Sequence, residues 1–184
     1  NIADLDLNQL RQIVGIIEQD IYLFSTSIKA NIAYGAHDIS EEAIINAAKA
    51  AQAHEFITDF KDGYDTVIGE RGITLSGGQR QRVAMARTFV TNPKILIMDD
   101  STSAVDAETE SRIQSAMGEL LKDRTTIIIT HRLSTLKNSD NIVFMDRGKI
   151  VTMGTHDELL ASFAPYRQIF EGYLPLPPIK EDDE

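Results

Sequence analysis

Leu75-Ser76-Gly77-Gly78-Gln79 opens a predicted helix, Gln79–Val90, and a break at Asn92-Pro93 leads from that helix into the apolar stretch Ile95–Met98. A serine and two glycines before a helix leave backbone N–H groups free at its N-terminus. Those groups and the helix dipole favour an anion such as phosphate there. An ordinary capped helix is the alternative interpretation, because Ser-Gly-Gly alone is a common sequence.

Two carboxylates, Asp99 and Asp100, directly follow the stretch Ile95–Met98. Four apolar residues suit a strand that is buried on both faces of a sheet. The carboxyl end of such a strand is where open α/β sheets bind ligands. A helix-capping turn is the alternative for Asp-Asp-Ser.

The hydrophobic period changes near residue 90. Residues 20–90 show helical patterns, with Ser40 as a predicted N-cap. Beyond them, strands alternate with helices, which indicates βαβ units and a parallel sheet. The expected strands are Ile95–Met98, Thr126–Thr130 and Ile142–Met145, the expected helices are Ala107–Leu121 and Leu133–Lys137, and Asp146–Lys149 is an expected hairpin turn.

Composition excludes several classes of function. The chain has 184 residues, which suits one compact domain or most of a larger domain, and 42% of them are hydrophobic, which suffices for a core. A net charge of −10 argues against a nucleic-acid partner. The absence of cysteine rules out disulfides, thiolate metal sites and cysteine nucleophiles. The longest apolar runs are too short to span a bilayer.

Five polar elements occur at places that are hard to obtain by accident: each follows a strand or a small-residue turn, or precedes a helix. With these elements, the chain from about Ile13 to Leu160 resembles the nucleotide-binding domain of an ABC transporter. The elements are Gln19, Leu75–Gln79, Asp99, Asp106 and His131.

The resemblance implies that ATP and Mg2+ bind between two such domains arranged head to tail. Gln19 matches the glutamine that contacts Mg2+ and the γ-phosphate, and Asp99 matches the Walker B aspartate at the metal. Asp100 stands at the position of the catalytic base, and His131 matches the switch histidine that contacts the γ-phosphate.

The dimer interface is implied by the same resemblance. Ser76, Gly77, Gly78 and Gln79 match the signature residues that contact ATP held by the opposing subunit, which is a second ABC nucleotide-binding domain. Asp106 closes the segment that crosses the interface.

Two further segments resemble those typical of ABC exporters: Thr66–Gly72, and the stretch from Leu23-Phe24-Ser25 through Asn31–Gly35. In that family they meet the coupling helices of the transmembrane domain. The resemblance therefore implies an ATPase that drives export of a substrate, membrane-associated through the full-length protein at the cytoplasmic face of the cell membrane. A charged surface turn with an ordinary amphipathic helix is the alternative.

The chain departs from the family in two ways. No G-x-x-x-x-G-K-[ST] phosphate loop occurs, and the Gly148-Lys149 pair is followed by Ile150. Truncation at the N-terminus is the simplest explanation, and we expect the 184-residue chain alone to be inactive or nearly so. Asp100 stands where active members usually carry Glu, and its shorter reach predicts a weakened base. Heterodimeric exporters often pair such a subunit with a fully catalytic one.

The expected fold is therefore α/β: a P-loop NTPase-type core with a parallel sheet, truncated at the N-terminus, plus a helical subdomain that carries the signature motif. Alternative functions are a non-hydrolytic ATP sensor, a half-site donor, a soluble non-transport ABC ATPase and a non-enzymatic interaction module. The expected division is 1–19 for part of the core, 20–90 for the helical subdomain, 91–172 for the remaining core and 173–184 for a disordered acidic tail.

Overall fold

A computed structural model describes residues 2–36, 38–69, 74–99, 112, 124–130 and 132–170. The chain divides into two compact units, Asn1–Ile129 and Thr130–Glu184, each of which is described by itself. The expected helix Ala107–Leu121, apart from Arg112, and the expected disordered tail lie outside the described residues. No helix in the described ranges is long and apolar enough to cross a membrane.

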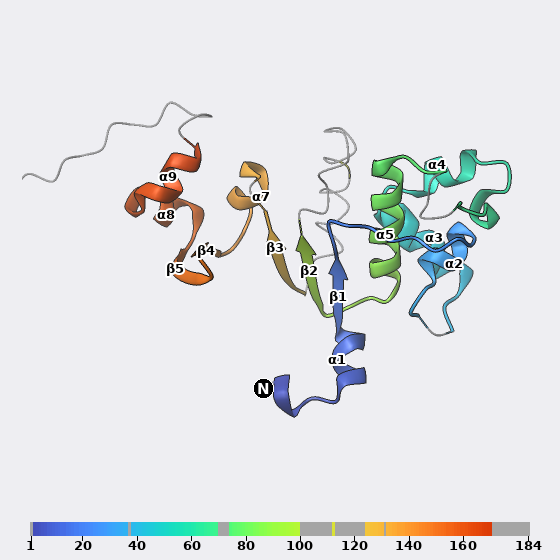
Figure 1. Cartoon of the computed structure of the whole chain (residues 1–184), viewed down its shortest axis with the longest axis horizontal. Coiled ribbons are helices and arrows are strands. Elements are labelled where there is room, and N and C mark those ends of the chain that lie inside the picture. The colour runs from blue at the N-terminus through green and yellow to red at the C-terminus, as the bar shows by residue number, and fades with distance from the viewer. Residues whose placement is uncertain are drawn as a thin grey trace, which may run out of the picture. The chain divides into compact units, whose positions relative to one another are not determined.

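The first unit combines a parallel sheet with a group of helices (Figure 1). Its strands are β1 Val14–Ile17, β2 Ile95–Asp99 and β3 Thr125–Ile129. Its α-helices are α1 Leu7–Ile13, α2 Ile28–Ile32, α3 Glu41–Ala50, α4 His54–Asp59 and α5 Gly77–Val90, and its 3-10 helices are η1 Ile2–Asp4 and η2 Gly63–Asp65.

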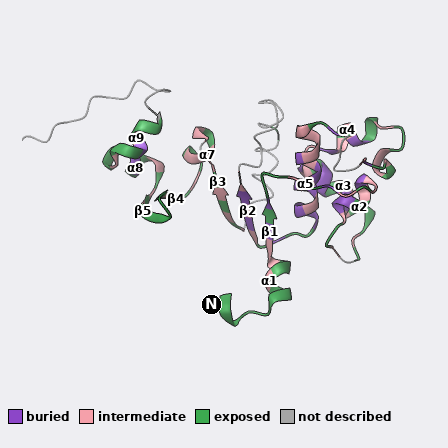
Figure 2. Cartoon of the chain, viewed as in Figure 1, coloured by how far each residue is buried: buried purple, intermediate pink, exposed green. Residues whose placement is uncertain are grey.

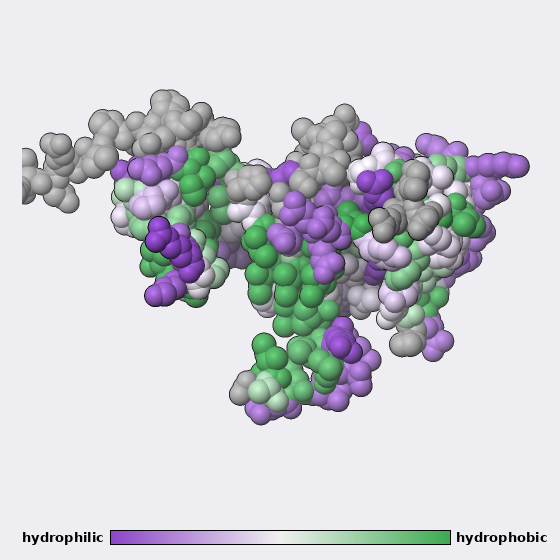
Figure 3. Space-filling model, viewed as in Figure 1, coloured by the Kyte–Doolittle hydropathy of each residue, from purple (hydrophilic) through white to green (hydrophobic). Residues whose placement is uncertain are grey.

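The sheet has the order β1-β2-β3, and both pairs of neighbouring strands are parallel, as the alternating pattern predicts. One face is buried: Ile17, Leu96 and Met98 belong to the same hydrophobic cluster as residues of α5. The opposite face is open, with Ile16 54% and Ile127 52% exposed, and Figure 3 shows hydrophobic surface gathered over these strands.

The expectation that β2 is buried on both faces is therefore wrong for the described structure. Ile95 and Ile97 are only partly buried, whereas Leu96 and Met98 are buried. Side chains alternate between the two faces of a strand, and the cluster shared with α5 covers one of them.

The helices of the first unit form around α5, and the buried side of the group faces inward in Figure 2. α3 begins as expected at Ser40, whose hydroxyl accepts a hydrogen bond of 3.2 Å from the backbone N–H of Ala43. Ile28, Ile32 and Met85 are fully buried. Burial of each such side chain contributes roughly 1.5–3 kcal/mol, so this helical core is a major source of stability.

The second unit contains a β-hairpin and three helices: α7 Leu133–Lys137, β4 Ile142–Asp146, β5 Lys149–Gly154, α8 His156–Ser162 and α9 Ala164–Phe170. The hairpin turn lies where the sequence places it, with positive φ angles of 46° at Arg147 and 76° at Gly148. Two consecutive positive φ angles characterise the turn that suits the twist of paired strands.

Candidate functional site

The carboxyl ends of β1 and β2 bring two of the predicted residues to one edge of the sheet. Ile17 pairs with Met98, and Asp99 pairs with Ile129 on β3. Gln19 follows β1 by two residues and is exposed, while Asp99 ends β2 and is partly buried. An amide oxygen and a carboxylate thus lie beyond the same edge, where parallel sheets bind ligands.

The N-terminus of α5 is formed by a capping box at Ser76. The Ser76 hydroxyl accepts from the backbone N–H of Gln79 at 3.2 Å, and the Gln79 side-chain oxygen accepts from the Ser76 N–H at 2.9 Å. This reciprocal cap starts the helix at Gly77, two residues earlier than the sequence suggests. The N–H groups of Gly77 and Gly78 belong to the first turn, where helical N–H groups lack intrahelical partners, so they remain suited to an anion.

The direction of α5 relates its N-terminus to the sheet edge. Its C-terminal end leads through Pro93 to Lys94. The Lys94 N–H donates a hydrogen bond of 2.9 Å to the carbonyl of Ile13, the residue before β1. From this amino edge the helix runs opposite to β1 (Figure 1). Fourteen residues extend for roughly 21 Å. Gly77 therefore lies on the carboxyl-edge side of the sheet, as do Gln19 and Asp99.

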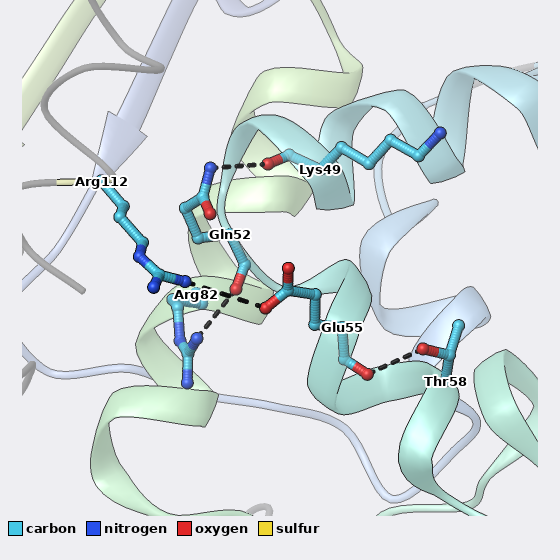
Figure 4. Close-up of polar contacts among 6 residues, drawn as sticks. All are labelled: Lys49, Gln52, Glu55, Thr58, Arg82 and Arg112. Carbon is cyan, nitrogen blue, oxygen red and sulfur yellow. Dashed lines mark hydrogen bonds and ion pairs between the residues drawn. The ribbon is translucent and has the colours of Figure 1, made fainter. Parts of the chain in front are cut away.

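Arginines of α5 hold the segments around the signature, and sequence reasoning missed their roles. Arg80 Nη1 donates to the carbonyl of Leu75 at 2.8 Å, which fixes the residue before the cap. Arg82 Nη1 donates to the carbonyl of Gln52 at 2.8 Å (Figure 4), and its guanidinium lies 4.7 Å from the ring centre of Phe56. The sequence indicates these contacts only by placing several arginines in a helix that also has many apolar residues.

Arg87 makes the most extensive of these contacts. Its Nε and Nη2 donate, at 2.8 Å each, to the carbonyl and the side-chain oxygen of Asn31, and its Nη1 donates to the carbonyl of Tyr22 at 2.9 Å. Burial lowers the pKa of the Arg87 guanidinium, an effect that the nearby Tyr34 opposes. Arginine nevertheless stays charged in proteins, so this is a partly buried cation held by neutral oxygens.

Parts of the exporter-like segments lie side by side. Ile28 donates its N–H to the carbonyl of Thr66, and Ile68 donates to the carbonyl of Thr26, at 3.0 Å each. Ser27 and Val67 form an isolated antiparallel bridge. Backbone hydrogen bonds therefore join two stretches that are about 40 residues apart in the sequence.

Three predicted site residues, Asp100, Asp106 and His131, lie outside the described residues. Among the described side chains, no group of three or more His, Asp or Glu is close enough to hold a metal ion. Mg2+ commonly needs only one or two protein carboxylates in addition to substrate phosphates and water. Asp99 and the Gln19 amide are oxygen donors of the kind that such an ion takes, so the described residues fit it.

Comparisons with known proteins agree with this geometry. The family model described as ABC transporter matches residues 1–103. The chain is 52% identical to a putative multidrug export ATP-binding/permease protein, YgaD, of Bacillus subtilis, and 50% identical to an ATP-dependent lipid A-core flippase of Acinetobacter baylyi. Each match covers 92% of this chain and 29–30% of the relative.

A solved structure of a bacterial Atm1-family ABC exporter with ATP bound superimposes with a TM-score of 0.87 at 46% identity. The match covers 92% of this chain and 30% of that exporter chain. The chain thus spans less than a third of the length of the proteins that it matches.

Proposed function

We propose a function from one established premise: this chain belongs to the ABC transporter family. It serves as the nucleotide-binding portion of an exporter, in which ATP binding and hydrolysis between two such domains drive a substrate across a membrane. The relatives named as export ATP-binding/permease proteins support the exporter class. Through the complete protein, the chain then sits at the cytoplasmic face of the cell membrane.

The observation that carries this proposal is the shared edge of Gln19, Asp99 and the N-terminus of α5. Two oxygen donors beyond parallel strands suit the metal ion of one polyphosphate. The glycine-bearing helix start on the same side of the sheet suits a second polyphosphate, held by the opposing domain. The family match alone would be an argument by analogy, because function depends on the site and not on the fold.

Each described residue then has a distinct role. Asp99 and Gln19 hold Mg2+, which neutralises charge on the phosphates when bound. Ser76, Gly77 and Gly78 offer one hydroxyl and two N–H groups to the phosphates of ATP held by the opposing domain. The capping box orients these donors before ligand arrives, and preorganised donors stabilise developing charge best. Gln79 supports them mainly through its cap.

The remaining roles rest on the family resemblance. Asp100 acts on the attacking water with a shortened reach, His131 contacts the γ-phosphate, and Asp106 lies at the dimer interface. The partner domain is then a more active subunit in a heterodimer, and the segments bridged at Ser27 and Val67 face coupling helices of the transmembrane domain. The division of the chain into core, helical subdomain and tail stays part of this proposal.

One alternative is favoured by a specific residue. With Asp100 in place of the usual Glu, the chain acts as a half-site donor: its signature completes the partner's site while its own site turns over slowly. A base must lie within hydrogen-bond reach of the proton that it abstracts. Hydrolysis by the assembled protein that doubles or more on Asp100→Glu would favour this role, and an unchanged rate would argue for a slow sensor or an already competent site.

The test of the main proposal uses Gly77→Asp in the complete gene product, assembled with its partner domain. A carboxylate in the first turn is favourable for the helix dipole, so α5 should remain folded. The same charge repels phosphate. We expect ATP hydrolysis to fall at least about a hundredfold, as for loss of a preorganised donor, with Gly77→Asn as the uncharged control. Equal rates for the wild type and Gly77→Asp would overturn the proposal.

A further inference from the structure

Two consecutive residues of α5 hold the chain on both sides of Gln19. The Thr88 hydroxyl donates to the carbonyl of Ile16 at 3.2 Å, three residues before Gln19. Arg87 Nη1 donates to the carbonyl of Tyr22 at 2.9 Å, three residues after it. The glutamine itself stays exposed between these two attachments. The backbone that presents it is therefore tied to the signature helix at both ends.

The attachment through Arg87 is rigid because every arm of the guanidinium is engaged. Besides Tyr22, it binds both oxygens of Asn31 at 2.8 Å, and it lies over the rings of Phe24 at 5.5 Å and Tyr34 at 5.7 Å. Asn31 is fully buried, and its side chain also bonds the N–H and the carbonyl of Phe24 at 2.9 and 3.0 Å. A planar fork with this many partners has one geometry, which Lys cannot reproduce.

The attachment through Thr88 is fixed by close packing. A Cβ on Gly15 would lie 2.7 Å from Cγ2 of Thr88 and 2.7 Å from Cγ of Pro93. The absence of a side chain at Gly15 thus lets the Thr88 methyl seat directly on β1. The Thr88 hydroxyl lies within hydrogen-bond distance of two carbonyls, that of Ile16 at 3.2 Å and that of Ala84, one turn earlier in α5, at 3.3 Å. The methyl packed against Gly15 keeps the hydroxyl between them.

We propose that Arg87 and Thr88 are positioning residues. They fix the segment from Ile16 to Tyr22, which carries Gln19, at a constant distance from the signature at the N-terminus of α5. Gly77 and Arg87 are ten residues apart, or roughly 15 Å of continuous helix. This inference rests on the proposed function, in which Gln19 contacts the metal and the signature contacts ATP. Any displacement of the signature end is then carried by α5 to Gln19 in the same chain.

The first test measures this distance directly and needs no catalysis. The chain has no cysteine, so Gln19→Cys with Ser76→Cys gives two spin-label sites, both at exposed positions. Pulsed electron paramagnetic resonance on the 184-residue chain should give one narrow distribution of distances between the two spin labels. Arg87→Met should at least double its width, because the loop loses one attachment, and Thr88→Val, an isosteric change, should broaden it too.

Arg82→Met is the matched control. Arg82 lies on the same helix and also bonds carbonyls and covers an aromatic ring, but its contacts with Gly78, Gln52 and Phe56 involve no residue between Ile16 and Tyr22. Its replacement should leave the distribution unchanged. Equal widths for the parent, Arg87→Met and Thr88→Val would overturn the inference, as would equal broadening by Arg82→Met.

The second test is a double-mutant cycle in the complete protein. Misplacement by about 1 Å can cost about a hundredfold in rate, so Arg87→Met should lower kcat by about 10- to 100-fold and change the KM for ATP by less than about threefold. In a Gln19→Ala background, the same change should cost less than about twofold, since coupled residues are not additive. Arg82→Met should reduce kcat by the same factor in both backgrounds.

The two tests separate the inference from the proposed function. Effects of Arg87→Met and Gln19→Ala that simply multiply would overturn the positioning role while leaving the ATPase assignment intact. A wild-type protein that does not hydrolyse ATP would overturn the assignment, together with the catalytic meaning of the positioning. An unbroadened distance distribution would refute the attachment itself, whatever the rate of hydrolysis.

Discussion

Gly15 is the position in this chain where one added methyl group has the most sharply defined consequence. In Gly15→Ala, the new Cβ meets the Pro93 ring and the Thr88 methyl at 2.7 Å. Neither atom is the end of a flexible side chain: one belongs to a closed ring, and the other to a β-branched residue within a helix. The strain must therefore separate β1 from the C-terminal end of α5.

The expected cost follows from two opposing terms. Overpacking of a core typically costs about 1–3 kcal/mol. Replacement of glycine lowers the entropy of the unfolded chain and returns about 0.4–1 kcal/mol. We therefore expect Gly15→Ala to lower the free energy of unfolding by about 1–2 kcal/mol.

Urea unfolding followed by far-ultraviolet circular dichroism is the suitable assay, because much of the first unit is helical. With a slope of about 2 kcal/mol per molar urea, the midpoint should fall by about 0.5–1 M. Gly69→Ala is the matched control: no heavy atom lies within 4 Å of its added Cβ. The lower entropy of its unfolded chain should raise its midpoint by about 0.2–0.5 M relative to the parent. If Gly15→Ala proves as stable as Gly69→Ala, the tight contact between β1 and α5 is refuted.

Leu96→Ala, at a fully buried position in the middle strand, should lower the free energy of unfolding by about 2–5 kcal/mol; a loss below 1 kcal/mol in urea unfolding would mean that the sheet core is not packed as described. In the capping box of α8, the hydrogen bond from the Thr155 N–H lowers the pKa of Glu158 below its ordinary 4.5. This cap therefore stabilises α8 above pH 4.5 and is lost as the pH falls through the lowered pKa. Amide exchange in α8 should show that loss, and Glu158→Gln should abolish its pH dependence. Asn31→Ala removes the hub that binds both Phe24 and Arg87 and should destabilise by at least about 2 kcal/mol, whereas a neutral effect in thermal unfolding would contradict the network.

Local sequence signals predicted much of this fold, because they act within a few residues. Ser40 and its two following glutamates predicted the start of α3, and the Arg147-Gly148 pair predicted the hairpin turn. Near residue 90 the hydrophobic pattern changes from the period of a helix to that of strands alternating with helices, and this change predicted the parallel sheet. The Ser40 side chain caps a backbone N–H of its own helix, and the glycine at 148 permits a positive φ angle in its own turn.

The missed features depend on contacts between distant segments. Arg87 and Tyr22 are 65 positions apart, and nothing near Arg87 in the sequence indicates which carbonyl it binds. The role of Gly15 likewise appears only once β1 and the C-terminal end of α5 lie together. The motifs of the candidate site are local, so the sequence could propose them, and their roles stay predictions. The contacts that position Gln19 join distant segments, so the sequence could not indicate them.

Protection of the signature serine by ATP tests the central claim most directly. Ser76→Cys introduces a single thiol into this chain, which has no cysteine. Glu42→Cys, at an exposed position near the start of α3, supplies a comparison thiol outside the signature. In the complete protein assembled with its partner domain, saturating ATP and Mg2+ should slow alkylation at position 76 at least tenfold and leave position 42 unchanged. Equal alkylation rates at position 76 with and without ATP would contradict a nucleotide site at the N-terminus of α5.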